Sequence, residues 1–174
     1  MLRGQFQPLL ALVDAARDVE ILRVLLESKE ECESLFEGAE GGMLAHFAPY
    51  LVRLSPQSPL LETLVREGWG KGWCVFLTSD KSFEELHRHF RHFLTVKTEE
   101  GGELYFRFYD PRVLRVFLPT CAPGEVDEFF GPVKYYLMEE ETPEVLLRFS
   151  VSSQGMGLTK LPLALEDEAK IGKE

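Results

Sequence analysis

The first quarter of the chain alternates a short apolar run with a stretch whose apolar residues recur at helical spacing. The run from Phe6 to Val13 predicts a strand that ends at Asp14. Asp18 can cap a following helix, because its carboxylate can accept hydrogen bonds from the first free backbone N–H groups. Apolar side chains then fall mostly on one helical face: Val19, Ile21, Leu22, Leu25 and Leu26.

The next quarter repeats this alternation after a turn-rich segment. Tyr50 to Leu54 predicts a second strand. Ser58 precedes Pro59, and a proline at the first helical position costs no hydrogen bond, so a short helix is predicted that stops at Gly68. The apolar run Trp73 to Leu77 predicts a third strand.

A capping box and a hairpin pattern follow. Ser82 and Glu85 stand three residues apart, which predicts a helix from Phe83 to Phe93. Two β-rich runs, Leu94 to Thr98 and Glu103 to Tyr109, flank a glycine-containing loop and predict a hairpin.

The last third of the chain predicts two short helices and a second hairpin. Asp110 is placed to cap a helix that starts at Pro111 and ends before Pro119. Another short helix is predicted from Gly124 to Phe130. The second hairpin combines two β-rich runs, Val133 to Glu139 and Val145 to Val151.

Alternating elements early and hairpins late predict an α/β or α+β fold, with a single mixed β-sheet and helices packed on its faces. Residues 1–151 are assigned to this domain. The Ser- and Gly-containing segment from Ser152 predicts a linker-like C-terminal tail, residues 152–174, although its leucines could dock elsewhere.

Composition and charge narrow the class of protein. With 174 residues, 45% of them hydrophobic, the chain can bury a core without a metal or disulfide. A formal net charge of -10 opposes binding to nucleic acid or to anionic membrane surfaces, and no apolar stretch approaches the roughly 18 residues of a membrane span. Three cysteines without CxxC spacing, and an N-terminal apolar run too short for a signal peptide, predict a cytoplasmic protein.

Two motifs that can mark a functional site, a glycine-rich segment and a cysteine, have structural explanations in this sequence. Gly68, Gly70 and Gly72 precede a strand, whereas a phosphate-binding glycine loop follows a strand and opens a helix. We therefore interpret them as a turn beside two tryptophans. Cys74 lies inside an apolar strand, where burial should raise the pKa of the thiol and leave it unreactive.

Histidines and carboxylates give no complete site either. His87, His89 and His92 crowd one helix, but their spacing does not place all three on one face, and no cysteine partner completes a zinc site. The paired carboxylates fall in charged or turn-like segments, where nothing would raise a pKa toward acid catalysis. We predict no catalytic residue, no metal and no cofactor.

One segment stands out, YFRFYDPRV from Tyr105 to Val113. As a strand it would place Phe106 and Phe108 on one face and Arg107 on the other with the two tyrosines. A partly buried Arg107 needs a carboxylate or carbonyl partner, which makes it either an internal clamp or an anchor for a partner's acidic group.

Several segments together resemble one known family. They are LLALVDAARD (9–18), SLFEG (34–38), APYLVRL (48–54), SPLLETL (58–64), GWGKGW (68–73), FEELHRHFRHFLTV (83–96), FRFYDPRVL (106–114) and FFGPV (129–133). In this order they look like the effector-adaptor, or chaperone, domain of bacterial type VI secretion systems.

The resemblance implies a non-enzymatic protein, encoded near a spike protein and a toxin, that binds the toxic effector and helps to load it onto the spike. The family's recurrent positions correspond here to Arg107, Asp110, Pro111, Arg112, Phe130, Gly131 and Pro132. The chain is short after Phe130, where many members carry a further lobe, so its cargo surface is expected to be smaller or different.

Two other functions remain open at this point. One is an enzyme or small-ligand protein that uses Arg107 or Arg112 to grip an anionic substrate near Asp110. The other is an immunity protein that blocks a toxin by binding it.

Overall fold

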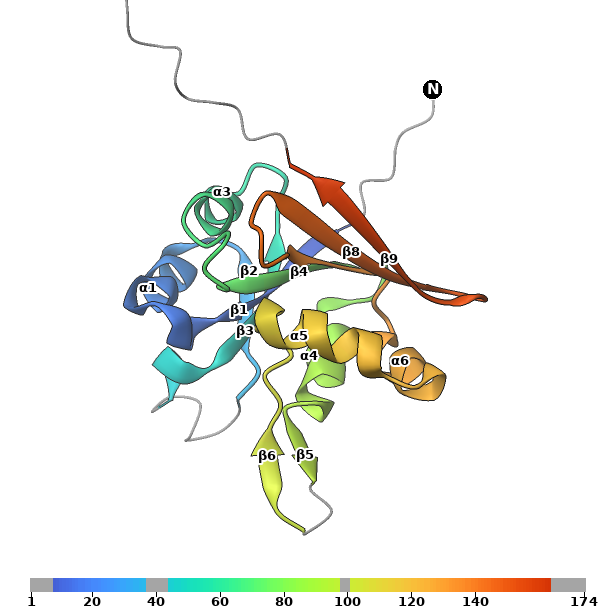
Figure 1. Ribbon diagram of the computed structural model, residues 1–174. Coiled ribbons are helices and arrows are strands. Elements are labelled where there is room, and N and C mark those ends of the chain that lie inside the picture. Colours follow the sequence, from blue (N-terminus) through green and yellow to red (C-terminus); the bar gives the residue numbers. More distant parts are fainter. Residues whose placement is uncertain (1–7, 37–43, 98–100, 164–174) are drawn as a thin grey trace, which may run out of the picture.

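The computed structural model describes residues 8–36, 44–97 and 101–163. Its main sheet has seven strands in the order β2-β3-β1-β4-β7-β8-β9 (Figure 1). The strands are β1 Leu9–Asp14, β2 Glu31–Ser34, β3 Pro49–Leu54, β4 Cys74–Thr78, β7 Tyr135–Glu139, β8 Val145–Ser152 and β9 Gly155–Pro162. The predicted α/β or α+β class is confirmed, but every strand pair described is antiparallel, so the sheet is not mixed in strand direction.

Strands β5 (Thr95–Lys97) and β6 (Glu103–Tyr105) form a separate two-stranded sheet, which projects away from the main one (Figure 1). The predicted first hairpin therefore exists, but it is shorter than expected and does not join the main sheet.

Helices cover both faces of the main sheet. They are α1 Val19–Glu27, α3 Pro59–Arg66, α4 Phe83–His92, α5 Pro111–Phe117 and α6 Pro123–Phe130, with 3-10 turns at Ala15–Arg17, Ala45–Phe47 and Leu118–Thr120. The predicted caps are confirmed, since Asp18, Ser58, Ser82 and Asp110 each accept a backbone N–H of the helix that they precede.

The central strands are buried on both faces, and their alternating side chains build two separate cores. Leu10 and Leu12 of β1 belong to the core beneath α4, α5 and α6. Ala11 and Val13 belong to the core beneath α1 and α3. This explains the continuous apolar run in the sequence, because a strand covered on both sides needs no polar positions.

Strand β9 corrects the prediction for the C-terminal tail. Residues 152–174 were expected to form a linker, but Gly155–Pro162 pair along their whole length with β8, in register from Ser152↔Gly155 to Val145↔Pro162. Most of β9 is exposed and it carries two glycines, so the alternation that marks a half-buried strand is weak. Residues 164–174 of the tail lie outside the described part of the chain.

Strand β2 was also missed. It is a short edge strand of polar residues, and only its backbone pairing with β3 defines it. In the described residues, no helix combines the length and apolarity needed to cross a bilayer.

Candidate protein-binding site

The segment containing Arg107 does not continue β6 as predicted. Tyr109 is buried in the same core as Phe108, so the expected alternation of faces is wrong there. The chain turns instead, with the Asp110 N–H donating to the Arg107 carbonyl at 3.0 Å. Asp110 then caps α5, with its side chain accepting the Arg112 N–H.

Arg107 is held by an internal carboxylate. Its Nη2 donates to Oδ2 of Asp14 at 2.5 Å, and the Asp14 side chain is 1% exposed while that of Arg107 is 43% exposed. Burial alone would lower the pKa of Arg107, but the hydrogen bond to Asp14 and the charges of Asp14 and Asp110 together raise that pKa above its ordinary value. Of the two roles proposed from the sequence, the geometry matches the internal clamp.

Arg112 likewise forms an ion pair with a buried carboxylate, that of Asp110. Its Nε and Nη2 donate to the two oxygens of Asp110 at 2.9 and 2.6 Å, a bidentate pair. Burial alone would raise the pKa of Asp110, but the side-chain and backbone hydrogen bonds from Arg112, together with the positive charges of Arg112 and Arg17, hold the pKa below its usual range. Pro111 is buried at the first position of α5, as expected for a structural role.

A third buried carboxylate, Glu139 at the end of β7, holds the glycine loop. The N–H groups of Gly70 and Gly72 donate to its two oxygens at 2.5 and 2.8 Å. Both glycines have positive φ, 79° and 72°, which turns their N–H groups inward. Burial raises the pKa of Glu139 even though these N–H groups lower it. The loop that resembles a phosphate cradle thus already holds an anion of the protein's own.

The Phe130-Gly131-Pro132 segment is a tight turn after α6. Gly131 has φ +43°, and a Cβ placed there would lie 2.6 Å from Cε1 of His89. The Pro132 carbonyl accepts a hydrogen bond from the Ser79 hydroxyl at 2.6 Å. Close packing therefore accounts for these residues without a ligand.

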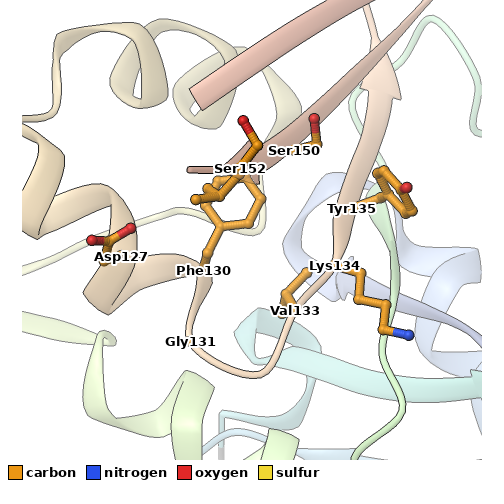
Figure 2. Close-up of a pocket in the computed structure, with 9 residues that line it drawn as sticks. Asp127, Phe130, Gly131, Val133, Lys134, Tyr135, Ser150 and Ser152 are labelled. Atoms are coloured by element: carbon orange, nitrogen blue, oxygen red, sulfur yellow. The ribbon is translucent and has the colours of Figure 1, made fainter. Parts of the chain in front are cut away.

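A polar pocket of about 530 Å³ opens beside this turn and includes Phe130, Gly131, Ser150 and Ser152. Figure 2 shows the Lys134 side chain directed away from Asp127. Lys134 forms an ion pair with Asp80 instead. The Lys134 ammonium is therefore already paired with a carboxylate that does not line this pocket.

The other candidate groups are also used internally. Nε2 of His87 and of His89 contact different carbonyls, those of Ser34 and Phe129, at 2.8 and 2.9 Å. In the described ranges no group of three His, Cys, Asp or Glu side chains could hold a metal ion. Burial raises the pKa of Cys74, as predicted, and raises that of Cys32 to about 12.

A second hollow, on the α1/α3 side of the sheet, is apolar, unlike the polar pocket beside the Phe130-Gly131-Pro132 turn. Its volume is about 350 Å³, and its walls are almost entirely hydrocarbon. Helix α3 supplies one wall, the strands supply the floor, and Trp69 stands at one side. It is lined by Leu9, Leu61, Val65, Trp69, Phe76, Leu137, Leu146 and Leu163, and we call this set the apolar groove.

The groove continues onto a part of the sheet that α1 and α3 do not cover. In the described chain, the core beneath these helices contains no residue of β8 or β9. The side chains that strand alternation and register place on this side include a set that we call the open face: Tyr135, Leu137, Leu146, Arg148, Thr159 and Leu161. In Figure 1, β8 and β9 extend to one side, beyond the two helices.

None of the groove residues was among the candidate residues from the sequence. A signal was present in α3, where Leu60 and Leu64 are buried in the core while Leu61 and Val65 form a second stripe spaced by four. A short helix with two apolar stripes has more hydrophobic surface than one core contact needs.

Comparison with known families adds one match. The family model described as "Domain of unknown function (DUF4123)" matches residues 9–128. This chain belongs to that family. The matched region contains Arg107, Asp110, Pro111 and Arg112 and ends before Phe130. No curated protein and no solved structure matches the chain.

Proposed function

We propose that this DUF4123 domain is an adaptor, or chaperone, of type VI secretion that binds a toxic effector and helps to load it onto the spike protein. In this proposal the protein is cytoplasmic, catalyses no reaction and needs no cofactor. The resemblance of the ordered sequence segments supports it, together with the membership in the DUF4123 family.

The apolar groove is the observation that carries the proposal. Exposed apolar surface next to well-ordered secondary structure is typical of protein-binding sites. Val65 is 48% exposed on its wall and Leu161 is 38% exposed on the adjoining open face. The two arginines that the sequence offered for binding a small anion, Arg107 and Arg112, pair with Asp14 and Asp110 instead.

Co-expression with the toxin encoded beside the gene tests this proposal. We expect affinity-tagged adaptor to co-purify with the toxin, and light scattering after size-exclusion chromatography to give a defined complex. A toxin that stays active in the complex supports an adaptor, whereas complete inhibition favours an immunity protein. If neither the toxin nor the spike protein binds, the proposal is wrong.

A further inference from the structure

We infer that the apolar groove and the open face bind an amphipathic helix of the effector, with an acidic side chain of that helix paired to Arg148. This inference rests on the proposed function and specifies the occupant of its binding site.

Arg148 lies on the open face, and no carboxylate of the described residues forms an ion pair with it. It sits opposite Leu137 of β7 and Thr159 of β9 in the strand register. Its guanidinium lies 5.4 Å from the Tyr135 ring centroid and donates weakly to the Thr159 hydroxyl at 3.5 Å. Its Nε is buried and has no hydrogen-bond partner among the described residues.

A cation beside a hydrocarbon groove, with no carboxylate partner in the described part of the chain, indicates the chemistry of a binding partner. A buried N–H without an acceptor is costly, so the described residues leave the Arg148 guanidinium incompletely satisfied, and a partner's carboxylate would form a charge-assisted pair with this guanidinium. The chain itself carries a formal net charge of -10, yet no described carboxylate forms an ion pair with Arg148. A partner segment with apolar side chains and one nearby acidic residue would complement both features.

The shape of the surface favours a helix over an extended strand. Strands β7, β8 and β9 cover two interstrand spacings, roughly 10 Å, which is about the diameter of an α-helix. Helices α1 and α3 already pack on this side of the sheet, and a third helix next to α3 would continue their layer. It would also cover the stripe formed by Leu61 and Val65.

The experiment measures the Kd of the purified adaptor and the neighbouring toxin by calorimetry. We expect Leu146→Asp and Val65→Asp each to raise Kd at least about tenfold, because each places a carboxylate in the groove. Val65 is already half exposed, so that variant should fold even if Leu146→Asp does not. Val116→Asp is the matched control, since Val116 is 64% exposed on α5 and lies outside the groove; its Kd should change less than about twofold.

Arg148→Gln tests the ion pair. We expect a rise in Kd of about thirtyfold, because loss of one member leaves a desolvated carboxylate unpaired. Hydrogen–deuterium exchange of the complex should show a helical toxin segment that becomes protected, and reversing an acidic residue of that segment to lysine should restore binding to Arg148→Glu.

The possible results distinguish failure of the helix-binding inference from failure of the proposed adaptor function. A wild-type complex whose Kd is unchanged by Leu146→Asp, Val65→Asp and Arg148→Gln overturns the inference and leaves the adaptor function standing. Protection of an extended toxin segment also overturns it. If the wild-type chain forms a dimer that Val65→Asp dissociates, the groove belongs to a second copy of the chain. Absence of any wild-type complex with toxin or spike overturns the function itself.

Discussion

The guanidinium of Arg107 donates to the buried carboxylate of Asp14 at 2.5 Å across 93 positions of sequence. This contact ties the end of β1 to the turn that precedes α5. Asp14 also accepts the Ala16 N–H at 3.1 Å, so one carboxylate organises two chain segments.

Replacing Arg107 should affect folding before it affects binding. Arg107→Ala leaves Asp14 buried without its cation, which we expect to lower the free energy of unfolding by about 2 kcal/mol. Urea denaturation measures this change, beside a calorimetric titration with the toxin. Arg23→Ala is the control, because its pairs with Glu20 and Glu27 are exposed and should contribute little. Unchanged stability with lost binding would instead make Arg107 a partner anchor.

The contribution of the buried Glu139 to stability should decrease as pH rises, which is the opposite of the usual behaviour of a carboxylate in a folded protein. Its pKa is raised in the folded protein, so the folded state binds the proton more tightly than the unfolded state does. The stabilisation is complete below the unfolded pKa of about 4.3 and is lost as pH rises through the folded pKa. Relative to Glu139→Gln, the wild type should therefore gain stability between about pH 7 and about pH 5.

Urea denaturation of both proteins at the two pH values checks this prediction. Only the difference in unfolding free energy between wild type and Glu139→Gln is informative, because Asp110 contributes a pH dependence of opposite sign to both proteins. Its lowered pKa stabilises the fold above its unfolded value of about 3.9, and that contribution is lost as pH falls through the folded pKa. A wild-type advantage that shrinks toward about pH 5 would contradict the environment described for Glu139.

Two glycines of neighbouring segments should respond oppositely to alanine. Gly131→Ala places a Cβ against His89 at a positive φ, and we expect a loss of about 1–3 kcal/mol. Gly124 lies in α6, where an added Cβ would meet no atom within 4 Å, so Gly124→Ala should be neutral or stabilising by up to about 1 kcal/mol. Thermal denaturation of the two variants compares them directly. Equal effects would show that the turn after α6 is looser than described.

Removal of β9 should destabilise the domain. A chain that ends at Ser152 loses all pairing to β8 and the contact of Met156 with the core. We expect a lower midpoint of thermal unfolding, by several degrees, because the loss of about 1–2 kcal/mol shifts the midpoint by that amount in a domain of this size. Circular dichroism measures it. An unchanged midpoint would restore the linker interpretation of residues 152–162.

Much of the candidate site could not be predicted from sequence. The recurrent residues Arg107, Asp110 and Arg112 stood out as charged residues in an aromatic segment, but their partners were not evident. Asp14 looked like a strand terminator, and its pairing with Arg107 arises only when the end of β1 meets the turn that precedes α5. Glu139 ends a strand in an acidic stretch, and its role depends on the glycine loop 67 positions away.

The local chemistry of the chain determined most of its elements. Caps at Asp18, Ser58, Ser82 and Asp110, and apolar runs in β1, β3 and β4, act over a few residues, so they can be recognised without knowledge of the fold. The tertiary structure alone decided the antiparallel strand order and the recruitment of β2 and β9, whose signal is backbone pairing with a distant partner. It also decided which apolar residues stay uncovered, because the groove exists only where α3 and β8 lie side by side without a helix between them.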